Sequence, residues 1–74
     1  MFARDKEYTV VNAIRAARLA AGLTQDDLAD TVQATRQTII AIEKGNYGPS
    51  VLLALKLAEA LDKKVEELFW YEKA

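Results

Sequence analysis

The sequence has 74 residues, of which 51% are hydrophobic and 28% charged, the composition of one small folded domain and not of a disordered chain. It contains no cysteine and no histidine, which excludes disulfides, Cys/His zinc sites and catalysis by a thiol or an imidazole, so we expect no enzyme, no catalytic residue, no metal and no cofactor. The longest apolar run, Val51 to Leu55, is too short to cross a membrane, and the start lacks the apolar core of a signal peptide, so we expect a cytoplasmic protein without membrane contact.

Apolar residues recur at helical spacing through almost all of the sequence, interrupted by one proline and three glycines. The pattern predicts an all-α fold of five helices in a single domain, residues 1–74. The first helix is expected over about residues 11–21, with Thr9 or Asn12 as its N-cap. Gly22 then supplies the left-handed residue that ends many helices.

Two further helices are expected on either side of a short turn formed by Gln33 and Ala34. The second helix, about residues 24–32, and the third, about residues 35–44, each begin at a threonine whose hydroxyl can cap the helix. Their inner faces are expected to hold Leu28, Ala29, Val32, Ile39 and Ile42. Three acidic residues of the second helix are interpreted as partners of the helix dipole in preference to a metal or acid–base site: Asp26, Asp27 and Asp30.

The last part of the chain, about residues 50–74, is expected to hold two helices and a tail. A loop over residues 46–49 leads to Ser50, which caps a fourth helix ending near Asp62, and a short fifth helix follows over about residues 65–69. The side chains expected to face the core are Val51, Ala54, Leu55, Ala58, Leu61, Val65, Leu68 and Phe69. The tail is either a frayed end or a strand exchanged with a second copy.

The second and third helices together, about residues 24–44, have the form of a helix-turn-helix motif. Two helices joined by a tight turn, the second starting with Thr35-Arg36-Gln37-Thr38, are the arrangement that places a recognition helix in the major groove of DNA. Four segments make the motif more specific: G-L-T-Q-x-x-L-A, T-R-Q-T-I, I-E-x-G and P-S-x-x-x-A-L-K.

In order and spacing these segments resemble the Xre family of phage repressor and Cro-type regulators, in its short compact form, over residues 14–61. The resemblance implies a five-helix, lambda-repressor-like DNA-binding domain and a transcriptional regulator, a repressor more often than an activator. Double-stranded DNA is the partner that it implies.

The resemblance also implies roles that side-chain chemistry supports. Arg36 and Gln37 suit bidentate hydrogen bonds to guanine and adenine, and the base contacts are expected from Arg36, Gln37, Thr38, Ile40 and Ala41. Phosphate contacts are expected from Gln25, Thr35, Lys44, Asn46 and Tyr47. Alternatives remain: Arg36 and Gln37 as solvated residues at a helix start, Ile40 buried by a slight rotation of the helix, and Tyr47 as a cover for the edge of the core.

In the resembling family an Arg and a Glu pair between the first and third helices, so Arg18 and Glu43 are interpreted as a structural ion pair and not as DNA contacts. Arg15, one turn earlier, is left as a solvent or phosphate group. The chain departs from the family at Gln33, where a Gly with positive φ is usual and where a Gln costs about 1 kcal/mol or shifts the turn. Small residues at Ala17 and Ala34 suggest compensating bulk from Leu19, or from Phe2 and Tyr8 folding back.

The net charge of −1 does not favour DNA binding by itself, but seven of the eleven acids lie near the ends or on the C-terminal helices, which leaves the middle free to present a basic face. We expect a homodimer, because one small reading head binds weakly and the chain carries more apolar surface than so small a monomer easily covers. The interface is expected at Leu52, Leu68, Phe69, Trp70 and Tyr71. The alternative is an antitoxin or a protein-interaction module that holds a toxin or another protein.

Overall fold

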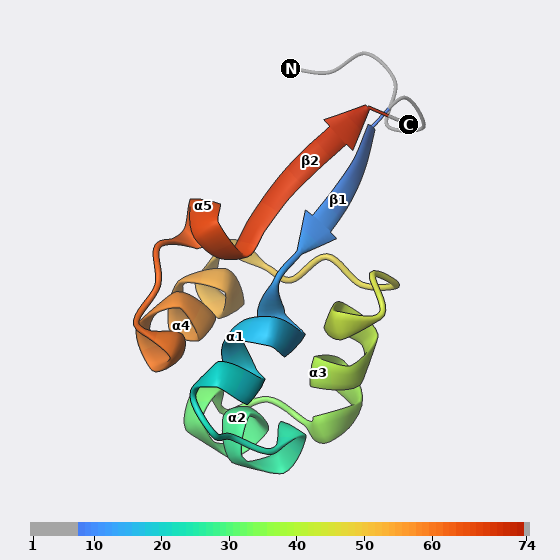
Figure 1. Ribbon diagram of the computed structural model, residues 1–74. Coiled ribbons are helices and arrows are strands. Elements are labelled where there is room, and N and C mark those ends of the chain that lie inside the picture. The colour runs from blue at the N-terminus through green and yellow to red at the C-terminus, as the bar shows by residue number, and fades with distance from the viewer. Residues whose placement is uncertain (1–7, 74) are drawn as a thin grey trace.

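The computed structural model describes residues 8–73, as five helices and a two-stranded sheet (Figure 1). The helices confirm the predicted all-α, lambda-repressor-like architecture, to which the sheet is an addition. In chain order the elements are β1 (Tyr8–Asn12), α1 (Ile14–Ala20), α2 (Gln25–Val32), α3 (Arg36–Glu43), α4 (Val51–Leu61), α5 (Val65–Leu68) and β2 (Phe69–Lys73). No helix within these residues is long and apolar enough to cross a membrane.

The sheet joins the two ends of the described chain. β1 and β2 pair antiparallel, with Val10 opposite Tyr71, and together they project from the helical body as a ribbon (Figure 1). The expected first helix was therefore wrong at its start, because residues 11 and 12 belong to a strand and α1 begins at Ile14. The fifth helix ends at Leu68, one residue earlier than expected.

Local sequence explains why these segments are extended. Thr9, Val10 and Val11 are β-branched and the segment from Phe69 to Tyr71 is aromatic, and both kinds of residue fit a pleated sheet better than a helix. Their pairing is nonlocal, so helical periodicity gave no indication of it. Residues 70–73 of the tail, which was expected to be either frayed or exchanged, pair within their own chain, and residue 74 lies outside the described residues.

The core lies between the helices and, within residues 8–73, consists of ten buried apolar side chains. It contains every inner-face residue predicted for the second and third helices; its full membership is Ile14, Leu28, Ala29, Val32, Ile39, Ile42, Leu57, Ala58, Leu61 and Leu68. Around it pack the half-buried Ala17, Ala34 and Phe69, among others. The bulk expected from Leu19 is not supplied, since that side chain is exposed. Phe2 lies outside the described residues, and Tyr8 packs edge-on against Tyr71 in the ribbon, with ring centroids 5.4 Å apart.

The phase of α4 differs from the prediction. Val51 and Leu55, expected to face the core, are 77% and 54% exposed, whereas Leu57 is fully buried. Ala58 and Leu61 are buried as expected. The reason is that α4 is apolar on nearly all sides, so its hydrophobic period does not determine which face is buried.

The helix ends follow the local rules closely. The hydroxyls of Thr24, Thr35 and Ser50 each accept a hydrogen bond from the backbone N–H three residues later, as expected of N-caps. Helices α1 to α4 all end in paired backbone bonds around a residue of positive φ, the pattern of a Schellman motif; these residues are Gly22, Gln33, Gly45 and Asp62. Gln33 has a φ of 59°, so the chain does adopt there the left-handed turn for which the family uses Gly.

Candidate nucleic-acid interface

The outer face of α3 carries the residues expected to read bases. Ile39 and Ile42 point into the core, which turns the remaining side chains of the helix outward. Arg36 and Gln37 are exposed at the start of the helix, while Thr38, Ile40 and Ala41 are half-buried along it. Ile40 is therefore neither fully buried nor fully free. The structure brings all five expected base contacts onto one helix, with the polar pair at its accessible end.

The cap of α3 also orders its first turn. The Oγ1 of Thr35 accepts from the backbone N–H of Thr38 at 3.2 Å and lies 3.0 Å from the Thr38 hydroxyl. Thr35 itself is exposed. The first turn is thus fixed by its own side chains, beside Arg36 and Gln37.

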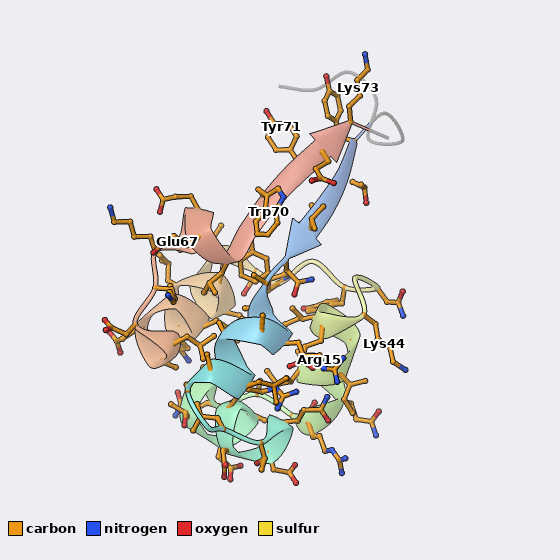
Figure 2. All side chains as sticks on the ribbon, viewed as in Figure 1. Arg15, Lys44, Glu67, Trp70, Tyr71 and Lys73 are labelled. Atoms are coloured by element: carbon orange, nitrogen blue, oxygen red, sulfur yellow. The ribbon has the colours of Figure 1, made fainter. Side chains whose placement is uncertain are left out.

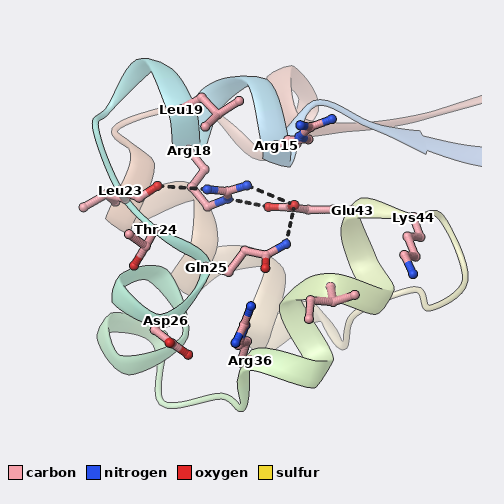
Figure 3. A pocket seen from close by; sticks show the side chains of 11 residues that line it. Arg15, Arg18, Leu19, Leu23, Thr24, Gln25, Asp26, Arg36, Glu43 and Lys44 are labelled. Atoms are coloured by element: carbon pink, nitrogen blue, oxygen red, sulfur yellow. Dashed lines mark hydrogen bonds and ion pairs between the residues drawn. The ribbon is translucent and has the colours of Figure 1, made fainter.

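A shallow groove of about 780 Å³ lies where α1, the start of α2 and α3 meet (Figure 3). Beside the paired Arg18 and Glu43, its lining carries three further cations and one further acid, and Ile40 gives it an apolar side; the cations are Arg15, Arg36 and Lys44 and the acid is Asp26. In Figure 2, Arg15 and Lys44 lie on the side of the helical body away from α4. Although the net charge of the chain is −1, this surface is locally cationic, as the distribution of acids suggested.

At the base of the groove Arg18 and Glu43 form the ion pair that the resemblance implies. Arg18 Nε lies 2.6 Å from Glu43 Oε2, and Arg18 Nη2 donates to Glu43 Oε1 at 3.2 Å, so the contact is bidentate. Arg18 Nη1 also donates to the carbonyl of Leu23 at 2.9 Å. Both side chains are less than a tenth exposed, so the pair links α1 to α3 from the inside.

Gln25 belongs to the same network, which changes its expected role. Its Nε2 donates to Glu43 Oε1 at 3.1 Å, and the side chain is half-buried (Figure 3). The amide nitrogen that was expected to hold a phosphate is therefore engaged with Glu43. Burial acts to raise the pKa of Glu43, but the hydrogen bonds from Arg18 and Gln25 and the charges of Arg18 and Arg15 outweigh it and hold that pKa below its usual value.

Lys44, Asn46 and Tyr47 follow α3 and are all exposed. The backbone N–H of Asn46 donates to the carbonyl of Ala41 at 2.9 Å, so the start of the loop is held against the last turn of the helix. Tyr47 lines two shallow hollows, one shared with β1 and one shared with Leu52 and Lys56. Tyr47 is 48% exposed, so it remains reachable from solvent.

One of the acidic residues of α2, Asp27, has a structural role in the structure. Asp27 accepts from the backbone N–H of Thr24 at 2.9 Å, completing a capping box, and this bond lowers its pKa. Within residues 8–73, no group of three His, Cys, Asp or Glu side chains is arranged to hold a metal ion.

Of the residues expected at a dimer interface, three are exposed. Leu52 is 63% exposed on α4, and Trp70 and Tyr71 are exposed on the ribbon (Figure 2). The prediction of Leu68 as an interface residue was wrong. Leu68 is 1% exposed, because it is the side chain by which the short helix α5 packs into the core. Phe69 is half-buried against the same core.

Sequence reasoning missed two kinds of residue. The first kind is Val51 and Leu55, which lie on the exposed face of α4 with Leu52. The uninterrupted apolar run from Val51 to Leu55 could have indicated this, because a helix that is apolar on all sides leaves some of these side chains exposed. The expectation of Thr9 or Asn12 as N-cap of the first helix was wrong, because Ala13 is the N-cap of α1. The side chain of Asn12 instead reaches the carbonyl of Ile42 on α3. No local pattern points to that contact, because the two residues are far apart in the sequence.

Comparison with known proteins agrees with this geometry. The family model described as helix-turn-helix matches residues 14–68. The HTH-type transcriptional regulator YgzD of Bacillus subtilis is 49% identical over 61 residues, covering 82% of this chain and 92% of the relative. An HTH-type transcriptional regulator of Methanocaldococcus jannaschii has the same identity and the same two coverages.

A solved structure is similar as well. The restriction-modification controller protein C.AhdI from Aeromonas hydrophila superposes with a TM-score of 0.69 at 37% identity, covering 73% of this chain and 82% of that one. The family match spans α1 to α5 and includes the capped α2–α3 pair with its outward-facing polar residues. The chain therefore belongs to the Xre family of helix-turn-helix transcriptional regulators, a family of DNA-binding proteins and not of enzymes.

Proposed function

We propose that the chain is a sequence-specific regulator that reads double-stranded DNA with α3 and acts as a homodimer, with repression as its effect and the cytoplasm as its place of action. The observation that carries this is the outer face of α3, where Arg36 and Gln37 are exposed on a first turn that Thr35 caps. Arg and Gln are the side chains that pair bidentately with guanine and adenine in the major groove. Repression in preference to activation follows the family resemblance.

The groove beside α3 supports a division between side chains that read bases and side chains that bind phosphates. Arg15 and Lys44 line the groove together with the buried Arg18–Glu43 pair and suit phosphate oxygens, which carry no base information. Asn46 and the N-terminal end of α2 add further groups that suit the phosphates of the DNA backbone. Because Gln25 donates to Glu43, its contribution to phosphate binding is expected from the helix end more than from its side-chain nitrogen.

The exposed apolar face of α4 supports the homodimer. Val51, Leu52 and Leu55 share this face, and an uncovered patch of three large aliphatic side chains on so small a domain is typical of an interaction surface. A two-fold axis at such a patch gives a self-complementary interface, and a symmetric dimer is the assembly that suits a DNA site with two related halves.

The test is selection of bound duplexes from a random pool by the purified protein, followed by binding measurements at several salt concentrations. Sequence-specific binding by a dimer predicts an enriched site with two related halves and an affinity that falls steeply with salt. Enrichment of no sequence, or affinity that is unchanged between low and physiological salt, contradicts the proposal.

A protein-interaction role, such as that of an antitoxin, remains the second candidate. The observation that favours it is the ribbon, where Trp70 and Tyr71 are exposed on opposite faces of a projecting two-stranded sheet. A second chain that binds in fixed stoichiometry, and whose binding is lost in Trp70→Ala, is the result that would support this candidate.

A further inference from the structure

Asn12 is a single side chain that joins three elements. It is the last residue of β1, it lies opposite Phe69 of β2, and it is half-buried. Its Nδ2 donates to the carbonyl of Ile42 on α3 at 2.8 Å, and its Oδ1 accepts from the backbone N–H of Ile14, the first residue of α1, at 3.2 Å. The side chain thus connects the foot of the ribbon, the start of α1 and the end of the recognition helix.

The carbonyl that Asn12 binds, that of Ile42, belongs to the last turn of α3. The last carbonyls of a helix have no partner in the next turn and need one from elsewhere. The Ile42 carbonyl accepts from the backbone N–H of Gly45 at 2.9 Å as well as from Asn12. The adjoining Asn46 N–H is bonded to Ala41, so the segment that presents Lys44 and Asn46 is built on this anchored turn.

Asn12 and Arg18 together tie this end of α3 to α1. Arg18 holds the side chain of Glu43, and Asn12 holds the carbonyl of the residue before it. These two polar contacts, to the successive residues Ile42 and Glu43 of α3, restrain both the position of the helix end and its rotation about the helix axis. A recognition surface needs such restraint, because its hydrogen bonds to DNA tolerate errors of only about 0.5 Å and 10–20°.

We propose that Asn12 is a positioning residue for DNA recognition, which holds the C-terminal end of α3 against α1 through the Ile42 carbonyl. The proposal rests on the DNA-reading role proposed for α3. Asn12 does not contact DNA in this account; it fixes Lys44 and Asn46 relative to Arg36 and Gln37, so that phosphate and base contacts form together.

Three variants separate this role from general stability and from charge. Asn12→Asp keeps the oxygen that caps Ile14 but replaces the donor to Ile42 by a second acceptor, so only the tie to α3 is broken. Asn12→Ala removes both bonds without adding charge. Thr9→Asp is the matched control, since it adds the same charge at an exposed position of the same strand.

The first measurement is binding to a duplex enriched by the wild-type protein and to a scrambled duplex of equal composition, at a temperature where thermal melts show each variant folded. We expect both Asn12 variants to weaken binding of the enriched duplex by about five- to tenfold, because a buried carbonyl loses a partner and the recognition helix loses its register. The preference for the enriched over the scrambled duplex should fall with it. Thr9→Asp should leave that preference unchanged, and equal preferences in all four proteins would overturn the proposal.

The second measurement needs no DNA. Amide hydrogen exchange at Gly45 and Asn46 should be about tenfold faster in Asn12→Asp and Asn12→Ala than in Thr9→Asp, because local opening at the end of α3 becomes easier. Faster exchange without any DNA enrichment would support Asn12 as the tie while refuting the function proposed for α3. Unchanged exchange at these amides would overturn the role of Asn12, whatever the DNA result.

Discussion

At the scale of single residues, the two ends of α3 present different chemistry to DNA. Arg36 at the start carries a planar guanidinium suited to a base edge, whereas Lys44 just beyond the end carries a compact charge suited to a phosphate. Both are exposed and both line the same groove. Substitution at each position should therefore affect DNA binding in a different way.

Arg36→Ala should cost about 1–3 kcal/mol on the preferred site and relax the base preference at one position. Lys44→Ala should weaken binding to all sequences alike and reduce the salt slope by about 1. Titration of enriched and single-base-substituted duplexes at several salt concentrations distinguishes the two effects. Lys63→Ala, an exposed cation after α4, is the control that should change neither, and identical profiles for Arg36→Ala and Lys44→Ala would show that the roles are misassigned.

The Arg18–Glu43 pair gives a prediction about stability. Arg18→Met or Glu43→Leu alone leaves a buried charge without its partner and should cost about 3 kcal/mol or more, while the double substitution should cost much less than the sum. Urea unfolding of the four proteins measures the coupling. Additive costs, with no coupling energy, would contradict the pair as an energetic unit.

The same ion pair predicts how the free energy of unfolding depends on pH. Because the folded pKa of Glu43 is lowered, its contribution to stability is present above its unfolded value of about 4.3 and is lost as the pH falls through the folded value. The wild-type protein should therefore lose more free energy of unfolding between pH 7 and pH 3 than Glu43→Leu does. Equal losses in the two proteins would show that the carboxylate is not preferentially stabilised in its ionised form.

At the scale of elements, the starts and ends of α2, α3 and α4 could be predicted from the sequence, whereas the start of α1 and the pairing of the two strands could not. Caps such as Thr24 and stops such as Gly45 act through backbone groups a few residues away, so their residue types are sufficient. The strand pair between residues 8–12 and 69–73 depends on contacts between distant segments. The buried face of α4 depends on its neighbours, because its own sequence is apolar nearly all round.

At Gln33 the backbone of the turn has a positive φ, which a glutamine side chain disfavours. Gln33 holds a left-handed turn at the end of α2, and its Oε1 accepts from Lys56 Nζ at 3.1 Å on the exposed surface. Gln33→Gly should raise the free energy of unfolding by up to about 1 kcal/mol, because it removes the strain of a side chain at positive φ and loses only a weak exposed contact.

Asp62→Gly is the matched control at the end of α4, where φ is 53°. Asp tolerates the left-handed region better than Gln does, so its replacement should stabilise less. Thermal and urea unfolding compare the two variants. A loss of stability in Gln33→Gly would show that the contact with Lys56 outweighs the backbone strain.

At the scale of the whole molecule, the reading surface and the apolar face lie on different elements. The groove with Arg15, Arg36 and Lys44 involves α1, α2 and α3, whereas Val51, Leu52 and Leu55 belong to α4. The cationic groove and the apolar face share no side chain, although Leu52 lines one hollow together with the expected DNA contacts Thr38 and Tyr47. A homodimer that closes through Val51, Leu52 and Leu55 therefore leaves Arg15, Arg36 and Lys44 outside the contact.

The last prediction concerns that assembly. Two recognition helices on one face of DNA must lie about 34 Å apart, and a single copy has only one such helix, so the proposed function requires a dimer. Leu52→Glu places a charge on the apolar face, so it should convert a dimer to a monomer at micromolar concentration and weaken binding to a two-half site far more than to a single half-site.

Sedimentation measures the first effect and duplexes with one or two half-sites measure the second. Leu19→Glu makes the same change at an exposed leucine on α1, and it should leave the sedimentation of the dimer unchanged. Trp70→Ala reports separately on the ribbon, because loss of the dimer in this variant alone would move the interface from α4 to the strands. A monomeric wild-type protein whose DNA affinity survives both Leu52→Glu and Trp70→Ala would refute the dimer, since neither apolar surface would then be needed for two copies to occupy one site.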